Sequence, residues 1–340
     1  MNARFKALVA TALLAPLLTA APSARSQDVK ERVIKLALAN TADSAHGIGA
    51  KRFAEIVTQK SGGKLKVNIF AGGQLGGEAV VATSMQSGLI EMSMMGPGLL
   101  TGMDKDFGIF DTPFLFNDAK EVDAVLDGPV GQKLLDKLPQ KSLIGLSYWD
   151  HGFRILTNSK RPVAKLEDMR GLKIRVQQIP VFIDTFAALG AHAVPMPFTE
   201  LFTGLETNAV DGQENPFISV QVTKFYEVQK YASNTRHAYS PLLVLASKPF
   251  WDQLSEPERK ILIDAANETK PYQREVSRSL DQKAVEVLKK EGMTITEVSA
   301  EERNRMREKV KPVIEKHQKT INEALVQELN AELQKVRSSN

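Results

Sequence analysis

The sequence of 340 residues contains no cysteine. This absence excludes disulfide bonds and thiolate metal sites. Aromatic residues make up only 6% of the chain, and beyond residue 26 no apolar run is long enough to cross a bilayer. The folded chain must therefore be stabilised mainly by the burial of aliphatic side chains, and its length is sufficient for that.

The N-terminal segment has the composition of an export signal. Two basic residues precede residues 7–21, which are almost wholly apolar and carry no charge. Ala24 and Ser26 place small side chains at the −3 and −1 positions of a cleavage site. The pattern predicts a secretory signal peptide over residues 1–26 and a mature protein in the periplasm; an uncleaved membrane anchor is the alternative.

Neither sign of charge dominates once this segment is removed. The whole chain has 44 basic and 40 acidic residues, and residues 1–26 hold three of the basic ones and no acid. The remaining 41 basic and 40 acidic residues give the mature chain a net charge of +1. A near-neutral chain with interspersed charges argues against binding of nucleic acid and against a role on the membrane surface.

Short apolar runs alternate with helical patterns along the mature chain. The runs that predict strands are 33–39, 64–70, 91–95, 143–149, 153–159, 172–176 and 193–195. Helical patterns follow Ser44 and cover 78–87, 180–189 and 199–207, and long amphipathic patterns cover about 252–337. This alternation in both halves predicts an α/β protein with two lobes, each built on its own largely parallel sheet.

No catalytic or metal-binding motif is present. The five histidines are scattered, and no two have the i,i+4 spacing of a helical metal site. The chain has no G-x-S-x-G nucleophile elbow and no phosphate-binding loop. In the glycine cluster 72–77, Gln74 replaces the second glycine of the dinucleotide-binding fingerprint. These absences lower the weight of an enzyme hypothesis.

Two arginines lie within predicted strands, Arg154 in FRILTNS and Arg175 in LKIRV. A buried arginine is costly unless its charge meets an anion. The planar guanidinium presents two parallel donors that match a carboxylate. Both a ligand carboxylate and an internal Asp or Glu would satisfy this requirement, so the pattern alone leaves both alternatives open.

The segment 171–217, which begins GLKIRVQQIP and ends VDGQENPF, closely resembles the extracytoplasmic solute receptors of TRAP transporters, the DctP family. Supporting segments are AGGQLGGE (71–78), GIFDTPFLF (108–116), FRILTNSKRPV (153–163) and KFYEVQKY (224–231). The resemblance spans nearly the whole mature chain in the same order. It implies the α/β fold of a two-lobed periplasmic binding protein, with a ligand cleft between the lobes and long bracing helices.

The resemblance also implies a function. Such a receptor binds a small organic carboxylate in the periplasm and delivers it to the membrane subunits of a TRAP permease. It is not an enzyme, spans no membrane and needs no cofactor or metal. The expected N-terminal lobe comprises residues 27–151 and about 241–279, and the expected C-terminal lobe comprises 152–240 and about 280–330.

Several residues match family positions that contact the ligand. Arg175 matches the arginine that pairs with the ligand carboxylate, and Arg154 matches a second basic contact. Asn215 matches the amide that completes the carboxylate clamp. Phe198 matches an aromatic wall, and Glu78 matches an acidic position that binds hydroxyl or amine groups in sugar-acid receptors.

Further polar residues are weaker candidates for the same cleft. Asn40, at the end of the first predicted strand, matches a polar ligand contact from the opposite lobe in the family; the other candidates are Gln74, His46, His151 and Tyr239. Three of them have a plainer alternative. His46 could lie on a helix surface, His151 could shape a turn after a strand, and Tyr239 could belong to hinge packing.

The ligand class is the least determined property. Where sialic-acid receptors carry a strand glutamate, this chain has Met95–Gly98, which argues against sialate. The leading hypothesis is a sugar acid such as a uronate or aldonate. The alternative ligands are a C4-dicarboxylate and an aromatic 2-oxo or 2-hydroxy acid. The alternative functions are a periplasmic sugar-acid enzyme, with Glu78 or His151 as base, and a receptor that docks to a sensor kinase.

Overall fold

The computed structural model describes residues 29–339, so the predicted signal peptide lies outside the described residues. The strands are β1 (Arg32–Ala37), β2 (Leu65–Phe70), β3 (Met92–Met95), β4 (Leu143–Asn158), β5 (Lys173–Val176), β6 (His192–Pro195), β7 (Gly212–Asn215), β8 (Tyr231–Ser247) and β9 (Thr294–Glu297). The helices are α1 (Ala45–Lys60), α2 (Glu78–Gln86), α3 (Ala119–Leu126), α4 (Pro129–Lys137), α5 (Pro180–Ala188), α6 (Leu201–Glu206), α7 (Phe217–Val222), α8 (Lys248–Trp251), α9 (Glu256–Lys290), α10 (Ala300–Gln318) and α11 (Glu323–Ser338). Within this described part of the chain, no helix is both long and apolar enough to cross a membrane.

Local sequence determines where the first helix begins and ends. The Ser44 side chain accepts a hydrogen bond from the Gly47 amide and so caps α1, as the sequence predicts. The apolar face of the helix buries Phe53 and Val57. The helix ends at Lys60, and the positive φ angles that follow are taken by glycines, which adopt them without strain.

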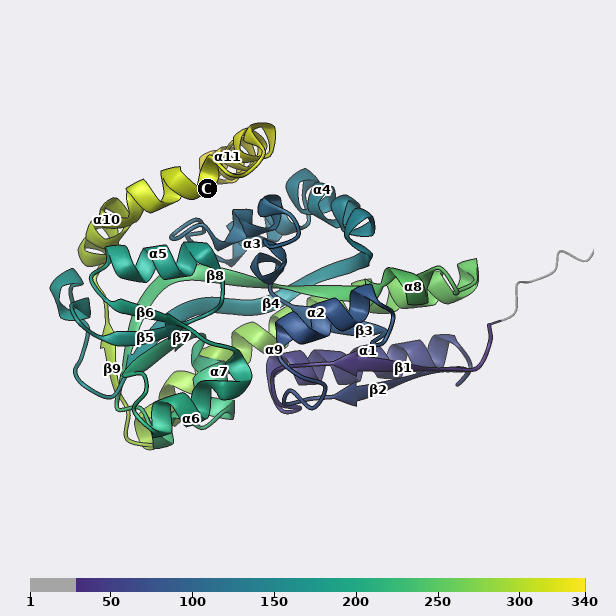
Figure 1. Ribbon diagram of the computed structural model, residues 1–340, viewed down its shortest axis with the longest axis horizontal. Coiled ribbons are helices and arrows are strands. Elements are labelled where there is room, and N and C mark those ends of the chain that lie inside the picture. The colour runs from purple at the N-terminus through teal and green to yellow at the C-terminus, as the bar shows by residue number, and fades with distance from the viewer. Residues whose placement is uncertain (1–28, 340) are drawn as a thin grey trace, which may run out of the picture.

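All nine strands belong to a single sheet, in contrast to the two sheets that the sequence predicts. Its order is β2-β1-β3-β8-β4-β7-β5-β6, with β9 paired to β8. The outer strands on both sides pair in parallel, whereas β4 and β8 form a central antiparallel pair. Figure 1 shows this pair running through both halves of the molecule and joining them. The runs 143–149 and 153–159 are therefore one strand, β4, and not two.

The central pair is irregular where it passes from one half to the other. The pairing register of β4 and β8 shifts between Asp150 and Gly152, and Gly152 has a φ angle of 128°. A bulge of this kind bends a strand without ending it. The polar interruption that separates two runs in the sequence is thus a bend in one continuous strand.

Each half of the molecule has its own hydrophobic core on both faces of the sheet. In the N-terminal lobe one cluster contains Phe53 and Trp149, and another contains Phe110 and Tyr148. In the C-terminal lobe the clusters form around Phe182 and Phe225. Figure 1 shows the lobes side by side, with α5, α6 and α7 in one and α1 and α2 in the other. The two-lobed α/β fold is therefore confirmed.

The longest helix, α9, braces both lobes. Its 35 residues span about 52 Å at 1.5 Å per residue. It contacts α1 and β4 along one part of its length and α7 along another. The Ser255 side chain and Glu258 form a capping box at its start. One continuous helix therefore supports both halves of the sheet.

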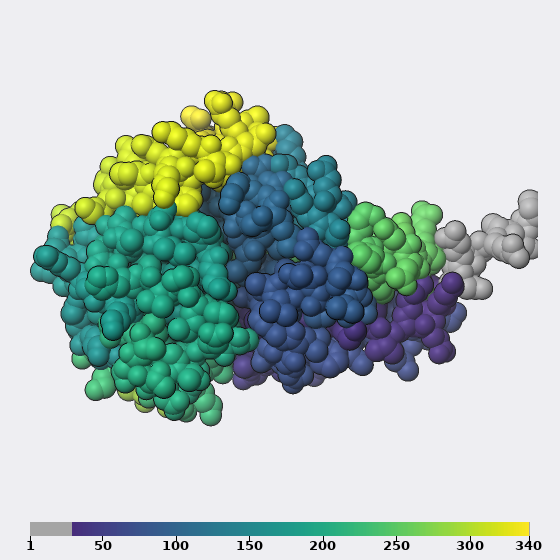
Figure 2. Space-filling view, viewed as in Figure 1, coloured from purple at the N-terminus to yellow at the C-terminus, as the bar shows by residue number. Residues whose placement is uncertain are grey.

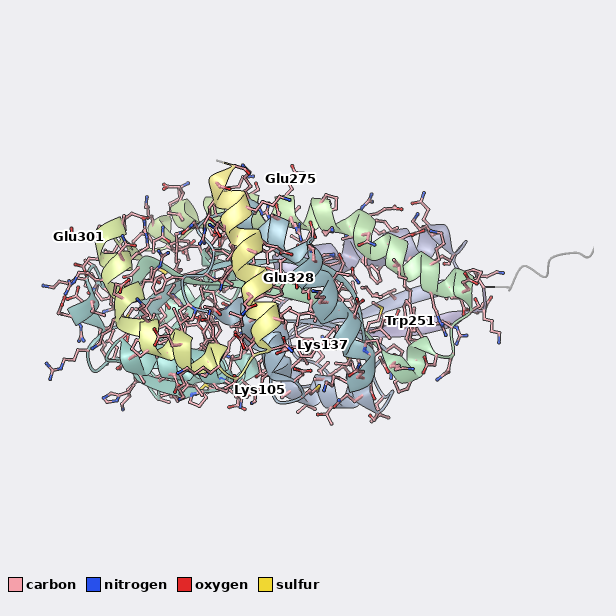
Figure 3. All side chains as sticks on the ribbon, turned by 90° about the horizontal axis from the view of Figure 1, so that it is seen from above. Lys105, Lys137, Trp251, Glu275, Glu301 and Glu328 are labelled. Carbon is pink, nitrogen blue, oxygen red and sulfur yellow. The ribbon has the colours of Figure 1, made fainter. Side chains whose placement is uncertain are left out.

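The last helix lies on the N-terminal lobe. Leu325, Leu329 and Leu333 of α11 join the core cluster that contains α3 and α4, whereas α10 contacts α5 of the other lobe. Figure 3 shows α11, on which Glu328 is labelled, and Glu328 forms an ion pair with Lys133 of α4 (2.5 Å). Residues 323–330 therefore pack on the N-terminal lobe, although the sequence assigns them to the C-terminal one, because the leucines of α11 complete the core around α3.

The two lobes touch each other across the cleft. Leu99 packs against core clusters of both lobes. A methyl group added at Gly98 would lie 3.0 Å from Ile179 Cδ1 of the opposite lobe. In Figure 2 the two halves meet along a narrow seam. The structure therefore has a closed arrangement, in which the space left between the lobes is small.

Candidate functional site

A cavity of about 140 Å³ lies between the two lobes. The N-terminal lobe contributes Gly77, Glu78, Ala79, Val80 and Leu99 to its wall. The C-terminal lobe contributes Arg175, Gln177, Gln178 and residues 196–200. Arg175, Glu78 and Phe198, three of the residues that the sequence proposes for the ligand site, therefore lie in one cavity and come from both lobes.

Within residues 29–339, Arg175 is a buried cation without an ionic partner. It lies in β5, and only 1% of its surface is exposed. Its Nε donates a hydrogen bond to the Met196 carbonyl oxygen (2.9 Å), but its Nη1 has no hydrogen-bond partner in residues 29–339. No carboxylate of those residues forms an ion pair with it. The guanidinium is therefore free to bind an anion that enters the cavity.

The surroundings of Arg175 affect its charge only modestly. Burial lowers its pKa to about 10; the charges of Glu214 and Glu78 oppose this shift, and that of Arg154 adds to it. The side chain thus remains cationic at neutral pH. Its Cζ atom lies 5.9 Å from the centre of the Phe198 ring, within the range of a cation–π interaction. This ring orients the guanidinium and forms an apolar wall beside it.

Arg154 is engaged in an internal ion pair. It is fully buried, and its Nε donates to Glu214 Oε2 while its Nη2 donates to Glu214 Oε1 (2.9 Å). Its Nη1 donates to the Ser240 hydroxyl (3.2 Å). Of the two alternatives that the sequence leaves open for this arginine, the structure contains the internal ion pair. A direct contact of Arg154 with the ligand stays a prediction.

Glu214 and Asn215 continue this buried network. Burial alone would raise the pKa of Glu214, but the charge of Arg154 and hydrogen bonds from His237 and Arg154 lower it to about 2. The Asn215 amide accepts from Arg154 Nη2 (3.1 Å) and donates to Gln213 Oε1 (2.6 Å). Asn215 thus belongs to the buried network around Arg154, and its role in a carboxylate clamp remains a prediction.

Glu78 faces Arg175 from the other lobe. It is the first residue of α2 and is half-buried. Burial raises its pKa, and the positive charges of Arg175 and Arg154 oppose that shift. It forms no ion pair with Arg175 in the described part of the chain. An acid at this place can accept hydrogen bonds from ligand hydroxyl groups while the ligand carboxylate occupies Arg175.

The two candidate histidines lie together and do not line this cavity. His46 is 97% buried, so its assignment to a helix surface is wrong. Its ring centre lies 4.5 Å from that of His151, in an edge-to-face arrangement. His151 Nε2 lies 3.1 Å from the Ser219 hydroxyl. Burial lowers the pKa of His46 to about 4 and that of His151 as well, so both rings are neutral.

The other candidates do not line the cavity. Tyr239 donates a hydrogen bond to Asp150 Oδ1 (2.6 Å), beside the irregular segment of β4. Asn40 is half-buried, and its carbonyl accepts from the Gly72 amide (2.8 Å). Gln74 is exposed. Ligand contacts by these three residues stay predictions.

Asp111 is a buried acid that the sequence does not single out. Its Oδ2 has no hydrogen-bond partner in the described residues. Burial raises its pKa to about 7; the charge of Arg154 opposes this shift and that of Glu214 adds to it. Its position inside the apolar run GIFDTPFLF is the feature that could have identified it, since an acid in such a run is expected to be buried.

Replacement of Asp111 by asparagine is expected to stabilise the protein increasingly as the pH rises. The acid is ionised in the unfolded chain above about pH 4 but resists ionisation in the folded one until about pH 7. Its stabilising contribution is therefore lost across this interval, at no more than about 1.4 kcal/mol per pH unit. Unfolding in urea at pH 5 and pH 8 measures the effect. An advantage of the variant that is equal at both pH values would contradict it.

Together the two lobes, the cavity between them and the guanidinium of Arg175, which is unpaired within residues 29–339, define a receptor for a small acid. Sequence comparison agrees, since residues 36–320 match the DctP family, the bacterial extracellular solute-binding proteins of family 7. The chain belongs to this family. Its members are periplasmic solute-binding proteins that work with TRAP permeases.

Individual members are similar over most of their length. The chain is 40% identical to the 2,3-diketo-L-gulonate-binding periplasmic protein YiaO of Escherichia coli K12, over 74% of this chain and 77% of that protein. It is similar to the crystal structure of the sugar acid binding protein DctPAm from Advenella mimigardefordensis in complex with galactonate, with a TM-score of 0.89, 44% identity and coverage of 91% and 100% of the two chains. A Polaromonas receptor bound to D-erythronate gives a TM-score of 0.85, 35% identity and coverage of 88% and 99%.

Proposed function

We propose that this chain, a TRAP solute receptor, captures a sugar acid in the periplasm and delivers it to its permease. The proposal rests on Arg175. Its buried guanidinium lines the cavity between the two lobes and has no anionic partner among residues 29–339. A ligand carboxylate supplies the missing charge. The galactonate and D-erythronate bound by the two similar structures are acids of this kind.

The wall opposite Arg175 favours a hydroxylated monocarboxylate over a C4-dicarboxylate. The cavity offers one cation without a partner and places Glu78 on its far side. A second ligand carboxylate would face this acid, and like charges in a water-poor site repel each other. Hydroxyl groups would instead donate to it. Phe198 is the one feature that suits an aromatic 2-oxo or 2-hydroxy acid.

A panel of acids tests the ligand class. Galactonate, glucuronate and erythronate are expected to raise the melting temperature, because a ligand at 100 times its Kd adds about 2.7 kcal/mol of stability. Succinate and phenylpyruvate represent the alternatives. Stabilisation by one of these two and by none of the sugar acids would overturn the proposed ligand class.

The alternative of a sugar-acid enzyme requires a base beside the ligand. Of the two candidates, only Glu78 lines the cavity, whereas His151 lies outside its lining, with Nε2 at 3.1 Å from the Ser219 hydroxyl. We therefore expect bound galactonate to be recovered unchanged by mass spectrometry after long incubation. Conversion of the ligand would establish the enzyme instead.

Glu78→Gln is expected to weaken galactonate binding by about tenfold or more, since a hydrogen bond to a charged group contributes about 1.5–3 kcal/mol. The amide keeps the size of the side chain but loses the charge that attracts hydroxyl donors. Hexanoate, which has a carboxylate and no hydroxyl, serves as the ligand control and should bind both proteins equally. Calorimetric titration measures both affinities. An equal loss for the two ligands would show that Glu78 acts through the fold and not through ligand hydroxyls.

A further inference from the structure

The lobes make a close contact at the edge of the cavity, between the loop 71–77 and the segment 197–199. At Gly77 an added methyl group would lie at ordinary distances, 3.7 Å from Thr199 Oγ1 and 3.8 Å from Pro197 Cβ. At Gly73 the approach is closer, because a methyl group there would overlap Thr199 Cγ2 and lie 3.6 Å from Thr199 Cβ. A side chain at position 73 would therefore require Thr199 to shift or the lobes to separate.

This contact adjoins the cavity whose wall includes Arg175. Thr199 and the neighbouring Phe198 both line that cavity. On the other side, the Gly73 amide donates to the Leu38 carbonyl just beyond β1 (2.9 Å), which fixes the loop to the sheet of the N-terminal lobe. The loop therefore cannot retreat without breaking a backbone hydrogen bond. The position of Thr199 against Gly73 limits how closely the lobes approach.

We propose that Gly73 and Thr199 form a closure contact that determines how far the lobes close over the ligand. A side chain at position 73 then holds the cleft partly open and weakens capture, although it touches neither Arg175 nor Glu78. The inference rests on the proposed function, because closure affects affinity only in a protein that encloses a ligand.

Gly73→Ala and Gly72→Ala form a matched pair for a binding test. Both glycines have positive φ angles, +73° and +67°, so an alanine strains the backbone similarly at either position. At Gly72, however, the added methyl group has no atom within 4 Å. By calorimetry with galactonate, Gly73→Ala should bind at least about tenfold more weakly than Gly72→Ala, as expected if the closed state falls to a tenth of its population. Equal affinities of the two variants would overturn the proposal.

Removal of the opposing methyl group should rescue the defect. Thr199→Ala deletes Cγ2, the atom that a side chain at position 73 would overlap. In this background the Gly73→Ala substitution should cost little further affinity, whatever Thr199→Ala costs alone. A cost that is equally large in both backgrounds would place the defect in the loop itself and overturn the closure contact.

A cysteine pair tests the contact without any ligand. The Cβ separation of 3.6 Å between positions 73 and 199 lies within the range of about 3.5–4.5 Å seen in disulfides, and the chain has no other cysteine. With oxidised glutathione, Gly73→Cys/Thr199→Cys should form an internal disulfide, detected as the loss of two hydrogens. Gly72→Cys/Thr199→Cys should not. Equal disulfide formation in both cysteine pairs would overturn the proposed closure contact. Failure of the wild-type protein to bind galactonate would instead count against the proposed ligand alone.

Discussion

Arg175→Ala is expected to abolish measurable binding of galactonate without destabilising the free protein. The wild-type guanidinium is buried with no anionic partner in the described residues, so its removal relieves a desolvation cost in the empty receptor. With ligand bound, the same change leaves a buried carboxylate unpaired. Loss of one partner of a buried pair costs about 3–5 kcal/mol, which is more than about a hundredfold in Kd.

Two further variants separate charge from geometry. Arg175→Lys keeps the charge but should also bind poorly, because an ammonium cannot reproduce the two parallel donors of a guanidinium. Arg170→Ala removes an exposed arginine of the same lobe and should bind normally. Calorimetry measures the affinities, and thermal unfolding without ligand measures the stabilities. Retention of galactonate affinity within tenfold of wild type in Arg175→Ala would remove the physical basis of the proposed function.

Local patterns predicted the separate elements of the fold well. Alternating apolar residues identified β2, and the cap at Ser44 identified the start of α1. The connection between the lobes was not predictable in this way, because Asp150 and Gly152 interrupt the apolar pattern although the strand continues through a bulge. No strand was predicted for residues 231–247 either. Long-range pairing with β4 determines that strand, and a local pattern does not contain this information.

The two arginines show a similar limit for the site. Arg154 and Arg175 both lie in apolar strands, and their local sequences do not distinguish a paired guanidinium from an unpaired one. The partner of Arg154 is Glu214, 60 residues further along the chain, in the buried strand β7. Only the fold assigns Glu214 to one arginine and leaves the other free. The ion pair between Arg154 and Glu214 therefore contributes to the site, because it occupies the buried acid and leaves Arg175 available for a ligand.

Glu214→Gln is expected to lower the free energy of unfolding by about 3–5 kcal/mol, because it leaves Arg154 buried without its counter-ion. The effect should be larger than that of an ordinary ion pair, since the charge of Arg175 is also nearby. Glu286→Gln is the matched control. It removes an exposed carboxylate paired with Lys289 (2.8 Å), and such pairs contribute at most about 1 kcal/mol. Urea unfolding at pH 7 measures both changes.

The pH dependence and a second substitution identify the cause of this loss. The folded-state pKa of Glu214 is lowered to about 2, so its contribution is complete above its ordinary pKa of 4.5 and disappears as the pH falls through 2. The stability difference between wild type and Glu214→Gln should therefore shrink below about pH 4.5. Adding Arg154→Met removes the unpaired cation and should restore much of the stability. A double variant no more stable than Glu214→Gln would show that the acid supports the fold by its packing, and that neutralising Arg154 is not its main role.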